Sequence, residues 1–146
     1  MTNEQTYGPD FTRRDPMDWL PVVLWATVIF LLSTSTFSAF NTARIIGPVV
    51  RLFVPDASTA TIVLIHTMVR KSAHFVEYGV LFWLLLRGPM HGRPYAALAV
   101  CVMYALLDEG HQIFVPGRTA SLYDVALDST GALFSRFLQA AIAEIA

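Results

Sequence analysis

Residues 70–88, RKSAHFVEYGVLFWLLLRG, join ionisable side chains directly to one of the most apolar runs of the chain. Arg70, Lys71, His74 and Glu77 come first, and residues 78–86 carry no charge. A helix that crosses the hydrocarbon of a membrane needs roughly 20 mainly apolar residues. The uncharged run alone is too short, so we predict a membrane helix that carries polar side chains in its first half.

The composition of the whole chain points to the same class of protein. Of its 146 residues, 55% are hydrophobic and 14% are charged, whereas a soluble domain usually has about 25% charged residues. The formal net charge is −1, and no basic run suggests a nucleic-acid partner. The single cysteine, Cys101, cannot form an internal disulfide. These features favour a small integral membrane protein.

Four segments approach the length of a membrane helix: residues 19–37, 67–87, 95–114 and 122–142. An earlier start for the second, near Ser58, stays open. The segment between the first two contains Gly47, Pro48 and Pro55, and is either a short interfacial or re-entrant helix or an ordinary loop. We therefore predict an all-α fold, an integral membrane four-helix bundle over residues 18–144, preceded by a polar tail at residues 1–17.

Charged side chains inside these segments should gather on one side of the membrane. Lys71 and His74 lie early in the second span, Asp108 lies late in the third, and Asp124 lies early in the fourth. Antiparallel neighbours bring these positions to one level. A charge that faces lipid is costly, so the side chains should face the bundle interior, where such groups mark a functional site by default. A purely structural network of ion pairs stays open.

Two stretches carry long polar patterns. KSAHFVEYGVL (residues 71–81) has the form K-x-x-H-F-x-x-Y-x-x-L, and residues 108–131 follow D-E-x-x-Q-x-F-x-x-x-R-x-x-x-x-x-D-x-x-x-N-x-x-G in all but one position. Together they resemble the VanZ-like family over roughly residues 19–137, and Ser33 and Ser35 fit a serine of that family. The departure is Asp128, where the family commonly has asparagine.

The resemblance implies a small bacterial integral membrane protein. The founding member of the family is linked to resistance to the glycopeptide antibiotic teicoplanin. The positions that match the patterns are carried over as expected site residues. They are Lys71, His74, Tyr78, Asp108, Glu109, Gln112, Arg118, Asp124 and Asp128, together with the small residue Gly131.

Two kinds of function fit these residues. In the first, the protein binds or moves an amphipathic cell-envelope molecule, a membrane lipid or lipid-linked head group, whose charge the cations and the rigid fork of Arg118 hold. In the second, it is a small membrane enzyme that performs acid–base or metal-assisted chemistry on a lipid head group. The catalytic candidates are His74, Asp108, Glu109, Asp124 and Asp128. We favour the first because no nucleophile motif and no metal-ligand spacing is present, and we expect no metal or cofactor.

Two further expectations concern side-chain direction and topology. Asp108 and Glu109 are about 100° apart on a helix, so we expect one to face the site, Asp108 with Gln112, and the other a neighbouring helix. His66 and His91 are expected to have no role. Both termini are expected in the cytoplasm of a multi-pass plasma-membrane protein. The basis is that Arg13, Arg14, Arg87 and Arg93 outnumber Arg44, Arg51 and Arg118 on the other side.

Overall fold

The computed structural model describes residues 15–37 and 39–145 of the chain. These residues form five α-helices and two short 3-10 helices, with no strand among them, which confirms the all-α class. Arg13, Arg14 and most of the expected tail lie outside the described residues. In chain order the elements are η1 (Pro16–Trp19), α1 (Leu20–Leu32), η2 (Ser35–Phe37), α2 (Ala39–Phe53), α3 (Thr59–Arg87), α4 (Pro94–Gln112) and α5 (Leu122–Ile145).

Local signals explain most of the helix boundaries. The side chain of Ser58 caps α3 by accepting a hydrogen bond from the Thr61 backbone N–H, so this helix begins at the earlier of the two starts left open. Pro21 and Pro94 lie in the first turns of α1 and α4, where a missing N–H costs nothing. α1 ends at Leu32, well before the expected position 37, and Ser33 is its C-cap.

The segment between the first two expected spans is a helix rather than a loop. α2 continues through Pro48 and places Val50 in a buried position. The side chains of Ile45, Leu52 and Phe53 are exposed, so part of the exposed surface of α2 is apolar. An interfacial location of this helix stays a prediction.

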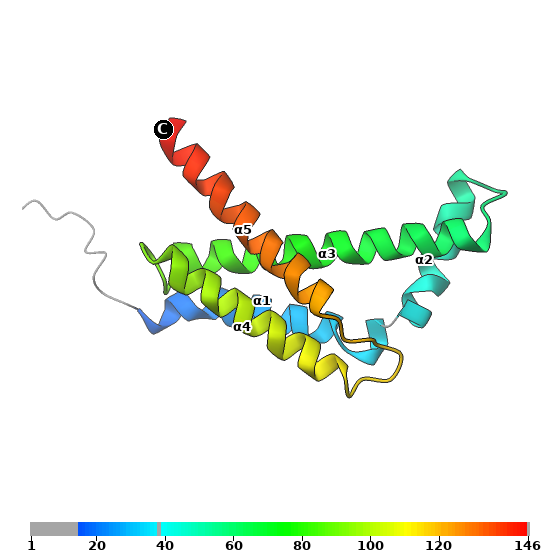
Figure 1. The fold of residues 1–146 in the computed structure, drawn as a ribbon, viewed down its shortest axis with the longest axis horizontal. Coiled ribbons are helices and arrows are strands. Elements are labelled where there is room, and N and C mark those ends of the chain that lie inside the picture. The colour runs from blue at the N-terminus through cyan, green and yellow to red at the C-terminus, as the bar shows by residue number, and fades with distance from the viewer. Residues whose placement is uncertain (1–14, 38, 146) are drawn as a thin grey trace, which may run out of the picture.

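The long helix α3 is the centre of the bundle, and α5 crosses it closely (Figure 1). A Cβ atom placed on Gly131 of α5 would lie 2.1 Å from the carbonyl oxygen of Phe75 in α3. The two backbones therefore touch, which only small residues allow. The core around this crossing contains Ile29, Tyr78, Leu81, Phe82, Leu85, Ala97, Cys101, Ala105, Val125 and Ala132.

The four expected spans overlap α1, α3, α4 and α5, and α3 extends furthest beyond its expected range. Across residues 15–37 and 39–145, no helix combines the length and the apolar composition that crossing a membrane requires. The helical fold is thus confirmed, whereas its placement across a membrane is not.

Candidate functional site

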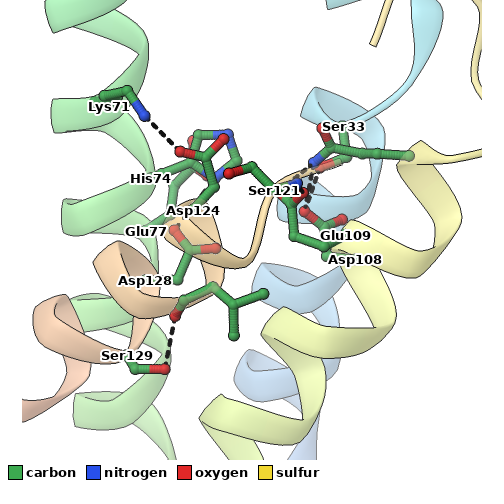
Figure 2. A network of polar contacts seen from close by, with 12 residues as sticks. Ser33, Lys71, His74, Glu77, Asp108, Glu109, Ser121, Asp124, Asp128 and Ser129 are labelled. Carbon is green, nitrogen blue, oxygen red and sulfur yellow. Dashed lines mark hydrogen bonds and ion pairs between the residues drawn. The ribbon is translucent and has the colours of Figure 1, made fainter. Parts of the chain in front are cut away.

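A cluster of polar side chains lies between α1, α3, α4 and α5, in the interior position that we expected from the sequence (Figure 2). All its members except His74 are almost fully buried, and the His74 side chain is 15% exposed. Burial of so many acidic groups is costly unless each finds a partner. We refer to this set as the polar cluster: Ser33, His74, Glu77, Asp108, Glu109, Gln112 and Asp128.

Asp108 joins the end of α1 to α4. Its Oδ2 atom accepts a hydrogen bond from the Ser33 hydroxyl at 2.7 Å and another from the Gln112 amide at 3.1 Å. Its Oδ1 atom is buried and has no hydrogen-bond donor among the described residues. One oxygen of this carboxylate therefore accepts two hydrogen bonds within the protein, and the other accepts none from the described residues.

Glu109 holds the chain at the start of α5. Its Oε2 atom accepts a hydrogen bond from the Ser121 backbone N–H at 2.7 Å, and its Oε1 atom accepts one from Gln112 at 3.2 Å. Asp108 and Glu109 thus reach different neighbours, as their angular separation requires. Both are nevertheless buried, and a single amide donates to both.

His74 and Asp128 face each other across α3 and α5. The His74 Nδ1 atom lies 3.4 Å from Asp128 Oδ1. Asp128 is fully buried, and neither of its oxygens makes a hydrogen bond with a described residue. The Tyr78 hydroxyl is also buried and has no hydrogen-bond partner among the described residues. Buried polar atoms are nearly always paired, so each exception needs an explanation.

The remaining expected residues lie at the edge of the polar cluster. Lys71 Nζ lies 2.5 Å from Asp124 Oδ1 and 4.5 Å from the centre of the Tyr123 ring, and both charged side chains are partly exposed. Arg118 instead donates to the backbone carbonyls of Leu32 and Thr34, which ties the α4–α5 loop to the end of α1. Burial, and then the like charge of Arg70, lower the pKa of the Arg118 guanidinium below its usual value.

A pocket of about 370 Å³ opens beside the polar cluster, between α2, α3 and the chain leading into α5. Its lining includes Ile62, His66, Arg70 and His74, which repeat every four residues along one face of α3. The His66 Nε2 atom lies 2.6 Å from the Thr42 hydroxyl of α2. From the sequence, we expected no role for His66 and did not include Arg70 among the ligand-binding residues. This four-residue spacing is the signal that could have found both.

The comparison with protein families covers all of these residues. The model of the family described as VanZ/LLP1 matches residues 19–142. The chain belongs to the VanZ/LLP1 family. This confirms the resemblance seen in the two sequence patterns, and the matched range includes the whole polar cluster and the pocket lining. No curated protein and no solved structure matches the chain.

A metal ion in this VanZ/LLP1 family member would require several His, Cys, Asp or Glu side chains close together. In residues 15–37 and 39–145, no group of three or more His, Cys, Asp or Glu side chains is arranged to hold one.

Lys71→Ala should lower the free energy of unfolding by about 1 kcal/mol, because its partly exposed pair with Asp124 is screened by solvent. Thermal unfolding in detergent, followed by tryptophan fluorescence, measures the change. Arg93→Ala removes an exposed cation with no side-chain capping bond and serves as the control. Equal melting temperatures for the two variants would show that the Lys71–Asp124 pair contributes nothing to stability.

Proposed function

We propose that this protein is an integral membrane protein that binds or moves an amphipathic molecule of the cell envelope, such as a lipid or a lipid-linked head group. The carrying observation is that Asp108 and Asp128 together bury three carboxylate oxygens that accept no hydrogen bond from a described residue, and only one of them, Asp128 Oδ1, lies near a possible cation, 3.4 Å from His74 Nδ1. A head group that offers hydroxyl or amine donors would satisfy such acceptors. Apolar packing alone does not account for them, because an apolar residue would avoid the cost of burying the charge.

The surface of the helices supports a lipid environment. Large apolar side chains are exposed along α1, α2, α4 and α5, including Leu24, Phe53, Leu107 and Phe137. Soluble monomers rarely expose apolar patches of this extent. The resemblance to VanZ-like proteins supports the same location. We extend the proposal to a multi-pass protein of the bacterial plasma membrane with both termini in the cytoplasm.

The proposal is tested by identifying what the full-length protein retains. The protein is purified from bacterial membranes in a mild detergent and released in the gas phase for native mass spectrometry. We expect one class of amphiphile to remain bound in a fixed ratio and to resist exchange against excess detergent. Retention of a random sample of the membrane lipids, in proportion to their abundance, would overturn the proposal.

Asp128→Asn should separate binding from stability. The substitution removes a fully buried charge that makes no hydrogen bond with the described residues, and it installs the residue common in the family. We expect the free energy of unfolding to stay constant or rise by about 1–2 kcal/mol, while retention of the bound amphiphile falls. Thermal unfolding and native mass spectrometry on the same preparation measure both quantities.

The control for this experiment is Asp56→Asn, which changes the same charge at an exposed position outside the cluster. It should alter neither quantity. If Asp128→Asn instead unfolds at a lower temperature and keeps its amphiphile, Asp128 is a structural partner of His74 rather than part of a binding site.

One observation favours a second candidate, a small membrane enzyme acting on a lipid head group. His74 lines the pocket, and the Asp128 carboxylate lies 3.4 Å from its Nδ1 atom. A carboxylate in this position orients an imidazole as a general acid or base. The two candidates differ in the expected behaviour of His74→Gln. An enzyme would bind its amphiphile but lose turnover, whereas a binding protein would show no turnover before or after the change.

A further inference from the structure

We infer that the pocket between α2 and α3 binds a phosphate group, with Arg70 as its anchor. The inference rests on the proposed function and adds the chemical class of the ligand, namely an amphiphile with a phosphate-bearing head group. It assigns a role to a cation outside the residues that match the family patterns.

The charges of the pocket lining leave one cation uncompensated. The lining contains the charged residues Arg70, Lys71 and Asp124. Lys71 and Asp124 pair with each other at 2.5 Å and so offset one another. Arg70 makes no hydrogen bond or ion pair with any residue in the described part of the chain. A guanidinium presents a planar fork of donors that matches the oxygens of phosphate.

A second guanidinium lies close enough to Arg70 to strengthen this preference. Burial, and then the charge of Arg70, lower the pKa of Arg118, so the two cations repel each other although nearby carboxylates act in the opposite direction. Arg118 is held in the α4–α5 loop by the carbonyls of Leu32 and Thr34 and cannot simply turn away. An anion beside Arg70 would offset the repulsion. A metal cation or an ammonium group at the same place would increase it.

The pocket is apolar at one end and polar at the other, as an amphiphile is. Ala43, Ile62 and Val63 line one end, and His74 and Asp124 line the other. Ile62 and His74 are twelve positions apart on α3, which corresponds to about 18 Å along the helix. The volume of about 370 Å³ lies within the range of about 300–1,000 Å³ typical of small-molecule sites. Phosphate at Arg70 would place the rest of the head group near His74, and through it near Asp128.

The test measures binding to the full-length protein in an uncharged detergent. The probes are dihexanoyl phosphatidic acid, dihexanoyl glycerol and inorganic phosphate, titrated by isothermal calorimetry. We expect phosphatidic acid to bind at least about tenfold more tightly than the uncharged dihexanoyl glycerol, because charge-assisted hydrogen bonds carry the difference. Arg70→Gln should remove this preference. Arg51→Gln, the same charge change at an exposed position of α2, should leave it unchanged.

The probes separate two sources of the phosphate group. If inorganic phosphate displaces phosphatidic acid, Arg70 recognises the anion itself. If excess inorganic phosphate fails to displace it, recognition requires the attached lipid. Either result supports a phosphate subsite, provided that Arg70→Gln weakens phosphatidic acid about tenfold. Should Arg70→Gln fail to fold, Arg70→Lys replaces it. The lysine keeps the charge but loses the fork, so we expect a several-fold loss of affinity.

Failure of this inference is distinguishable from failure of the proposed function. Equal affinities for phosphatidic acid and dihexanoyl glycerol, or equal behaviour of Arg70→Gln and Arg51→Gln, overturn the phosphate subsite and leave amphiphile binding intact. Unchanged affinity in Arg70→Lys, where that variant is needed, also overturns it. Absence of binding by both lipids, together with no selectively retained amphiphile in mass spectrometry, overturns both proposals.

Discussion

Gly131→Leu should destabilise the folded state by about 3 kcal/mol or more. A Cβ atom at this position would lie 2.1 Å from the Phe75 carbonyl oxygen, 2.9 Å from its carbonyl carbon and 3.1 Å from its Cα atom. All three are backbone atoms, so no side-chain rotation relieves the clash, and α5 must move away from α3. Overpacking of a core typically costs about 1–3 kcal/mol, and a clash between two backbones lies at or above the upper end. The yield of monodisperse protein in detergent and its melting temperature measure the effect.

Gly110→Ala is the matched control for this experiment. Gly110 also lies inside a helix, but a Cβ atom there meets nothing within 4 Å. Since alanine favours helix over glycine by up to about 1 kcal/mol, this variant should be as stable as the original protein or slightly more so. Recovery of Gly131→Leu with an unchanged melting temperature would mean that α3 and α5 do not cross with their backbones in contact.

Asp108→Ala should produce the largest loss among the polar positions, about 3 kcal/mol in the free energy of unfolding. The substitution removes the acceptor of the Ser33 hydroxyl and one acceptor of the Gln112 amide. An unsatisfied buried donor costs about 1–3 kcal/mol, and the missing carboxylate leaves a cavity as well. Because Ser33 caps α1, the end of this helix should also loosen, which hydrogen exchange of the backbone amides near Leu32 would detect.

Asp108→Asn separates the shape of the side chain from its charge. The carbonyl oxygen of an asparagine can replace Oδ2 and accept the hydrogen bonds of Ser33 and Gln112. Its amide nitrogen then takes the place of Oδ1, which accepts no hydrogen bond from a described residue. We therefore expect most of the stability lost in the alanine variant to be retained. Equal losses for alanine and asparagine would instead show that the negative charge itself holds the network together.

The helices could be predicted from the sequence largely because their signals are local. Ser58, Pro21 and Pro94 mark helix starts through local interactions that do not depend on the rest of the chain. The early end of α1 could not be found in this way. Ser33 follows the last turn of α1 and bonds Asp108, a residue of α4 far away in the chain. Only the packed arrangement of the two helices reveals that contact.

For the candidate site too, the sequence predicted part of the arrangement and not the rest. Antiparallel helices bring Lys71 and Asp124 to one level, and the two side chains do meet. Which acid pairs with which partner depends on the rotation of each helix about its axis, and the sequence patterns do not specify rotation. Arg118 illustrates the limit: the sequence placed it in a loop beside the site but did not indicate that it donates hydrogen bonds to the Leu32 and Thr34 carbonyls at the end of α1.

The attachments of the α4–α5 loop affect how a ligand would be held. Arg118 fastens this loop to α1, and Glu109 fastens its far end at Ser121. Two loop residues form part of the pocket wall: Thr119 lies between the two attachments, and Gly117 directly precedes Arg118. The conformational entropy of this wall is therefore lost during folding and need not be lost again when a ligand enters. The wall is preorganised, and its affinity for a ligand depends on residues that the ligand never touches.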